Sequence, residues 1–190
     1  MQEEKKSKTR TKRIAQTGIF TALAVVLGYL LVFIPNIELM SSVIFVSGWL
    51  FGPLVGITVG ALSFAIFSLF NPLGASMPPL FFAQIIGGII IGASGFLFKM
   101  VLTGLPVFLK VFIIGLGGGV VTFIFDILTN VGGFIAFTTK ETFLAYLSTG
   151  IIFSILHIVS NMLIFTLIVL PAVNRIEHIS KRKKGNIGEE

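Results

Sequence analysis

Few residues of this 190-residue chain can do chemistry in apolar surroundings, and five of them fall into two short groups. Asp126, Thr129 and Asn130 are three and four residues apart, which places them on one face of a helix. His157 and Asn161 are four residues apart and share a face in the same way. Together these groups offer donors and acceptors for the polar edge of a small ligand. The alternative is that they cap a helix end and bridge neighbouring helices.

A second set of polar residues stands beside predicted chain breaks. Asn36 and Glu38 follow Pro35, and Asn71 opens a rigid turn, residues 71–79, that contains three prolines and a glycine. Gln84 lies one to two turns into the helix that follows this turn, where its amide offers both a donor and an acceptor. Trp49 could stack on a flat ligand, although aromatic residues at helix ends also mark membrane interfaces. The candidate substrate-binding residues are therefore Asn36, Glu38, Trp49, Asn71, Gln84, Asp126, Thr129, Asn130, His157 and Asn161.

Several kinds of chemistry are excluded by residue types that are absent. The chain has no cysteine, so disulfides, thiolate metal sites and cysteine nucleophiles are ruled out. His157 has no second histidine at ligand spacing, which argues against a metal site. The glycine run at residues 115–119 is not followed by the Lys-Ser/Thr pair of a phosphate-binding loop. We therefore expect no catalytic residues, no metal and no cofactor.

Composition predicts an all-α integral membrane protein. Apolar residues make up 55% of the chain, charged residues only 12%, and the mean hydropathy is +1.01. Runs of about 20 apolar residues are long enough to cross a bilayer. Proline, glycine and polar breaks leave a long connection over residues 129–148 and divide the chain into six predicted transmembrane helices: Ile14–Ile34, Leu39–Phe51, Leu54–Phe70, Pro78–Phe98, Val111–Leu128 and Thr149–Leu170.

The distribution of charge predicts the orientation of these helices. Of the fourteen Lys and Arg residues, thirteen fall on one side of a six-helix topology, and only Lys140 falls on the other. Under the positive-inside rule, both termini are cytoplasmic and the polar connections face outward. We expect a basic cytoplasmic segment at residues 1–13, a membrane domain at 14–172 and a basic cytoplasmic tail at 173–190. Such basic runs are typical of contacts with anionic membrane lipid, and no nucleic-acid partner is expected.

Small residues recur at four-residue spacing on the first predicted helix. Gly18 and Ala22 form one such pair, and Ala24 and Gly28 form another. Small side chains let two membrane helices approach closely. We interpret this face as a docking surface for another membrane subunit.

The chain resembles the substrate-binding S component of energy-coupling factor (ECF) transporters over its whole length. The resemblance rests on the basic N-terminus, the six predicted spans, the small residues of the first helix, the stretch Phe67-Ser68-Leu69-Phe70-Asn71-Pro72-Leu73-Gly74, and Asp126-Ile127-Leu128-Thr129-Asn130. In the usual family motif on the first helix both small positions are Ala, whereas here the first is Gly18.

This resemblance implies a non-enzymatic, multi-pass protein of the bacterial cell membrane. Such a protein captures an extracellular vitamin and delivers it through a transmembrane coupling subunit driven by two cytoplasmic ATPases. Because few formal charges line the predicted outer face, we favour a largely neutral and partly aromatic ligand, such as riboflavin or a benzimidazole-type cobamide precursor.

Two alternatives come from other functional classes. A self-sufficient ion-coupled transporter is one, although the chain shows neither clear inverted repeats nor a row of midplane carboxylates. The other is a CAAX-type intramembrane protease, which the pattern Phe153-x-x-x-His157-x-x-x-Asn161 resembles. Those proteases also need a paired-glutamate motif within a helix, and the adjacent glutamates here lie in the two tails.

Overall fold

The computed structural model describes residues 2–138 and 142–187, and within these ranges it is helical without any strand. A π-helical turn at Phe165–Val169 joins the last two helices into one continuous rod, so the described part holds six rods. The helices are α1 (Gln2–Leu30), α2 (Met40–Phe51), α3 (Pro53–Leu69), α4 (Pro78–Leu102), α5 (Val107–Phe137), α6 (Phe143–Ile164) and α7 (Leu170–Ile187).

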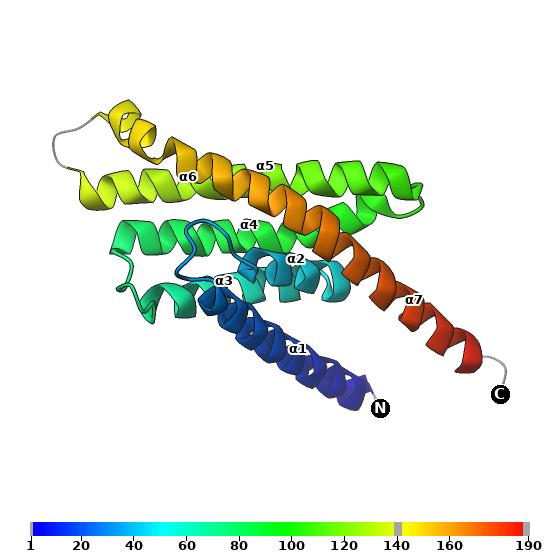
Figure 1. The fold of residues 1–190 in the computed structure, drawn as a ribbon. Coiled ribbons are helices and arrows are strands. Elements are labelled where there is room, and N and C mark those ends of the chain that lie inside the picture. The colour runs from blue at the N-terminus through cyan, green and yellow to red at the C-terminus, as the bar shows by residue number, and fades with distance from the viewer. Residues whose placement is uncertain (1, 139–141, 188–190) are drawn as a thin grey trace.

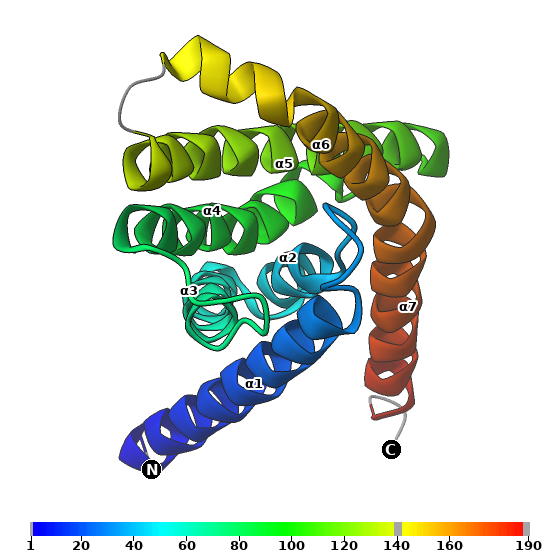
Figure 2. The same cartoon turned by 60° about the vertical axis from the view of Figure 1, so that its left-hand side comes forward.

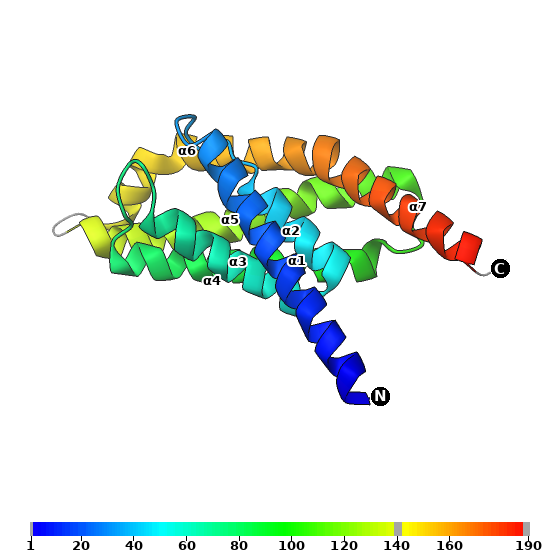
Figure 3. The same cartoon turned by 90° about the horizontal axis from the view of Figure 1, so that it is seen from below.

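The rods are arranged so that alternate connections lie at opposite ends of the bundle. Figure 1 shows the α1–α2 and α3–α4 connections at the same end as the last turn of α5 and the first turn of α6. The beginning of α1, the α2–α3 and α4–α5 connections and the end of α7 lie toward the other end. Viewed from below, α1 crosses the bundle obliquely over α2 and α3 (Figure 3). Both ends of the described chain are therefore on the basic side of the bundle.

Helix length and composition confirm the all-α membrane class. Four helical stretches are long and apolar enough to cross a membrane, namely Gln2–Leu30, Pro78–Leu102, Val107–Phe137 and Phe143–Ile176. The two shorter apolar helices, α2 and α3, are joined by a single residue, Gly52, whose φ of 93° favours glycine. With 12 residues, α2 rises only about 18 Å, so it reaches part of the way through a hydrocarbon layer of about 30 Å.

Glycines bring α3 and α4 into direct backbone contact. A Cβ atom added to Gly56 would overlap the carbonyl oxygen of Gly92, and one added to Gly60 would overlap that of Gly88. Helices packed this closely gain dispersion contacts between their backbones, which is the main source of association energy in lipid. The regular glycine spacing on these two helices therefore serves packing within the chain.

The predicted long connection over residues 129–148 is wrong. Helix α5 continues to Phe137 and α6 begins at Phe143, so most of that segment is helical. Gly132 does not break α5 because it packs against α4, where an added Cβ would lie 2.8 Å from Cβ of Ala83. Glycine in a membrane helix permits such a close approach, whereas in a soluble sequence it more often marks a break. Lys140 lies outside the described residues.

The predicted bounds at the two ends of the chain are also corrected. Helix α1 begins at Gln2, within the basic segment, and ends at Leu30 instead of Ile34. Pro171 was expected to end the last span, but the helix continues past it as α7. The π turn before Pro171 widens the helix, and the amide of Leu170 donates to the carbonyl of Phe165, five residues back. Such a turn accommodates a proline ring that would clash in a regular α-helix.

Candidate ligand-binding cavity

A cavity of about 470 Å³ lies at the end of the bundle that carries the α1–α2 connection. One of its walls is residues 31–39, which we call the capping loop; Figure 2 shows this loop between the end of α1 and α6. The volume falls within the range of small-molecule sites. Residues of all six rods, of the capping loop and of the α3–α4 connection line the cavity: Gly28, Leu31, Val32, Phe33, Ile34, Pro35, Asn36, Ile37, Glu38, Met40, Ser41, Phe64, Phe67, Asn71, Leu73, Gln84, Phe125 and His157.

Asn36 fixes the capping loop to α6. Its Nδ2 donates to the carbonyl oxygen of Phe153 at 2.6 Å, and Oγ of Ser160 donates to the Asn36 carbonyl at 3.1 Å. Asn36 has a φ of 58°, a left-handed conformation that asparagine tolerates better than most residues. Asparagine therefore suits both the left-handed backbone conformation of the loop and the hydrogen bond that holds the loop to α6.

Three ionisable residues from three parts of the chain meet at the cavity. His157 Nδ1 lies 2.7 Å from Asp126 Oδ1, and its Nε2 lies 3.9 Å from Glu38 Oε1. The other oxygen of Glu38 accepts a hydrogen bond of 2.8 Å from the amide of Ser41, at the start of α2. The imidazole thus joins the capping loop to α5. Sequence spacing could not reveal that Glu38 completes this triad, because Glu38 is far from the other two residues in the chain.

The pKa of Glu38, which lies in the capping loop outside the helices, is shifted by opposing effects. Burial raises the pKa of the Glu38 carboxyl, but His157 and the amide of Ser41 lower it by more. The net result is a pKa below the usual value for glutamate. Glu38 is therefore an anion on the cavity wall at neutral pH.

Gln84 is held in one orientation by two serines. Both Ser68 Oγ and Ser76 Oγ donate to Gln84 Oε1, at 2.6 Å and 2.9 Å. Because both hydrogen bonds go to the oxygen of this amide, its nitrogen points away from the two serines. The Nε2 group of Gln84 can then donate to a ligand.

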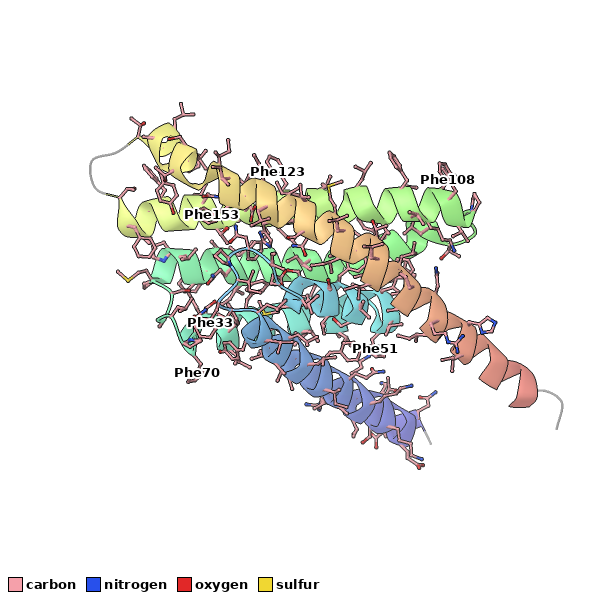
Figure 4. The ribbon with its side chains drawn as sticks, in the orientation of Figure 1. Phe33, Phe51, Phe70, Phe108, Phe123 and Phe153 are labelled. Atoms are coloured by element: carbon pink, nitrogen blue, oxygen red, sulfur yellow. The ribbon has the colours of Figure 1, made fainter. Side chains whose placement is uncertain are left out.

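Aromatic rings form much of the remaining wall, and sequence reasoning did not select them. Phe64 and Phe125 pack with centroids 4.9 Å apart, and Phe67 stacks on Tyr29 at 5.1 Å. Phe125 also meets the His157 ring edge-on at 6.1 Å. With 20 phenylalanines in the chain, no spacing rule distinguished these three from rings that face lipid. Figure 4 shows how widely other phenylalanines are spread, with Phe33 at the capping-loop end and Phe108 at the opposite end.

Six of the ten predicted substrate-binding residues come together here. Asn36, Glu38, Asn71, Gln84 and His157 line the cavity, and Asp126 lies behind His157. Asn161 is fully buried one turn from His157 but does not line the cavity, and its two amide atoms have no hydrogen-bond partner within the described residues.

The other three predicted residues lie away from the cavity and make hydrogen bonds within the protein. Thr129 Oγ1 and Asn130 Nδ2 donate to carbonyls of their own helix, at 3.0 Å to Phe125 and 2.7 Å to Asp126. Trp49 is buried near the far end of α2, where its carbonyl accepts a hydrogen bond of 3.0 Å from Lys99 Nζ. None of the three lines the cavity.

The four small residues of α1 divide between two faces. Gly18 and Ala22 line a groove of about 1180 Å³ between α1 and α3, and nothing lies within 4 Å of a Cβ added to Gly18. Ala24 is fully buried, and a Cβ on Gly28 would lie 3.2 Å from the Phe67 ring. We call the first feature the α1–α3 groove; basic residues line its end nearest the N-terminus, namely Lys6, Arg10 and Arg13.

The fold and the cavity define a multi-pass helical membrane protein with room for a small ligand. Residues 8–177 match the family model of the ECF-type riboflavin transporter S component, and the chain belongs to this family. The resemblance found in the sequence is thereby confirmed. This is a family of vitamin-transporter subunits and not of enzymes. No curated protein and no solved structure shows significant similarity to the chain.

Proposed function

We propose that this chain captures riboflavin, or a closely related flavin, in the cavity beneath the capping loop. Family membership supports a vitamin of the riboflavin type. The observation that carries the proposal is the cavity itself, which combines aromatic walls with oriented polar groups. A flavin has a flat ring system with donors and acceptors on one edge, and it carries a hydroxyl-rich chain.

The lining suits both parts of such a ligand. The rings of Phe64, Phe67 and Phe125 offer apolar faces for stacking or edge-on contact with the flat ring. Gln84 and Asn71 offer amide groups for its polar edge, and Glu38 offers an acceptor for hydroxyl donors. A benzimidazole would use the aromatic walls but would leave most of these polar groups without a partner.

We further propose that the cavity opens to the outside of a bacterial cell. The cavity lies at the end of the bundle opposite the basic ends of the described chain. The positive-inside rule places basic segments in the cytoplasm, which leaves the capping loop on the external side. A ligand from the medium would then reach the cavity without crossing the membrane.

Transport would depend on partner proteins, since the chain carries no phosphate-binding loop for ATP. We propose that a transmembrane coupling subunit, driven by two cytoplasmic ATPases, docks in the α1–α3 groove. Gly18 and Ala22 keep this groove open and allow a partner helix to approach closely. The groove and the cavity are separate, so docking need not displace the vitamin.

Uptake of labelled riboflavin tests whether this chain binds the vitamin while its partners drive transport. Cells or vesicles that hold the chain together with the coupling subunit and ATPases should accumulate riboflavin only when ATP is supplied. The matched sample holds the chain alone. Accumulation by the chain alone, driven by an ion gradient, would contradict the proposal and would support the secondary-transporter alternative.

A further inference from the structure

The cavity wall has an excess of negative charge. Glu38 and Asp126 are carboxylates, and the only group between them that can be positive is His157. With both carboxylates ionised, the one imidazole offsets at most one of the two negative charges, which leaves the triad with a net charge of −1 or lower. No lysine or arginine is among the described residues that line the cavity.

Glu38 is the member of the triad best placed to meet a ligand. Its side chain lines the cavity and is 21% exposed, although its Oε1 is itself buried, 3.9 Å from His157 Nε2. Asp126, by contrast, lies behind the imidazole and makes a 2.7 Å contact with it. A carboxylate on a cavity wall repels anions and favours hydroxyl donors nearby.

We infer that Glu38 is a specificity-determining residue that admits the free vitamin and rejects its phosphate ester. This inference rests on the proposed function, because it assumes that the ligand is a flavin. Riboflavin and its 5′-phosphate differ only at the end of the hydroxyl-rich chain. One offers a hydroxyl that can donate to Glu38, and the other offers a phosphate with a charge of about −1.5 to −2.

The cavity is small enough that a phosphate bound inside it would lie close to the Glu38 carboxylate. A compact space of about 470 Å³ is about 10 Å across, so a phosphate held inside would lie within about one Debye length of Glu38. Between buried groups, screening by salt is weak and the local dielectric is lower than in water. Sites that bind phosphate usually supply arginine, lysine or a helix N-terminus. The described lining has no lysine or arginine, and at the start of α2, which does line the cavity, the Ser41 amide already donates to Glu38. The cavity should therefore discriminate between the two flavins by repelling the phosphate as well as by attracting the hydroxyl.

The experiment compares the affinities of riboflavin and riboflavin 5′-phosphate for the purified full chain in detergent. Quenching of flavin fluorescence gives both dissociation constants under identical conditions. Wild type should bind riboflavin at least about tenfold more tightly than the phosphate ester, as expected for one unfavourable charge contact. Glu38→Gln should reduce this preference by about tenfold, because it removes the charge and keeps an acceptor for the Ser41 amide.

Two controls separate charge from shape and position. Glu38→Asp retains the charge and should retain the preference for riboflavin. Glu4→Gln removes a carboxylate from the exposed beginning of α1 and should leave the preference as in wild type. If Glu38→Gln does not fold, Asp126→Asn removes one charge from the same triad and should also reduce the preference.

The inference is overturned if folded wild type binds the two flavins equally. It is overturned as well if a folded Glu38→Gln or Asp126→Asn variant has the same preference as wild type. Failure of the proposed function looks different, because wild type would then bind neither flavin. The two ideas can therefore fail separately.

Discussion

The cavity and the α1–α3 groove both include residues of α1 and α3 but differ in what completes their walls. The last turns of α1 and α3 face the cavity, where buried ionisable and aromatic side chains from other rods complete the wall. Earlier turns of α1 and α3 face the groove, whose described lining comes from these two helices alone. One end of this helix pair is thus completed within the chain, and the open groove at the other end fits our proposal that a partner docks there.

The largest effect on stability should come from replacing Gly92, which packs against the backbone of α3. Replacing Gly18, which lines the groove, provides the contrast. Gly92→Leu would force a side chain into the backbone of α3 at Gly56, so it should destabilise the fold by more than about 3 kcal/mol. A Cβ added at Gly18 meets no atom within 4 Å, so Gly18→Leu should fold as wild type does. Thermal unfolding in detergent compares the two. A Gly92→Leu protein as stable as wild type would show that the α3–α4 contact is looser than described.

The next effect should separate docking from binding. Gly18→Leu combined with Ala22→Leu fills the α1–α3 groove, so ATP-driven riboflavin uptake should fall at least about tenfold while riboflavin affinity stays within about twofold. Ala15→Leu adds the same bulk at an exposed position outside the groove lining and should leave uptake unchanged. Uptake that survives the double substitution would mean that the partner docks elsewhere. A parallel loss of affinity would mean that the groove supports the cavity.

A smaller effect is expected within the cavity. Asp126→Ala removes the partner of His157 Nδ1 and should weaken riboflavin binding by about 1–3 kcal/mol, because the imidazole loses both its orientation and its charge partner. Asn130→Ala, one turn along the same helix, should change affinity by less than about threefold, since Asn130 bonds only a backbone carbonyl. Titration of flavin fluorescence measures both. Equal losses would place Asn130 in the site and overturn the distinction drawn between them.

The smallest effect on binding should come from Trp49. Trp49→Phe leaves a ring at a buried position near Lys99, away from the cavity, so riboflavin affinity should stay within about twofold while stability falls by about 1 kcal/mol. Isothermal titration and thermal unfolding on the same preparation give the two values. A marked loss of affinity with little loss of stability would restore Trp49 as a ligand contact.

Local patterns predicted most of the helices and several polar residues that line the candidate cavity, but not the contact between Glu38 and His157. Proline and glycine breaks placed α2, α3 and the start of α4 closely, because these breaks act on the backbone directly. Gly132 does not end α5 because it packs against α4, and Pro171 does not end the last rod because the π-helical turn accommodates its ring. His157 and Asp126 were selected because an ionisable residue within a membrane span is energetically costly and usually has a functional role. The phenylalanines were not selected, since an apolar ring costs nothing in lipid.

Direct binding of riboflavin by the purified chain, without ATP or partner proteins, tests the central claim most directly. Native mass spectrometry should show a single flavin bound to each chain, and added riboflavin should raise the unfolding temperature in a concentration-dependent way. Asp126→Ala should lower the bound fraction, whereas the Gly18→Leu and Ala22→Leu double variant should retain it. A folded wild-type chain that binds no flavin, with no shift in unfolding temperature at any riboflavin concentration, would contradict the account.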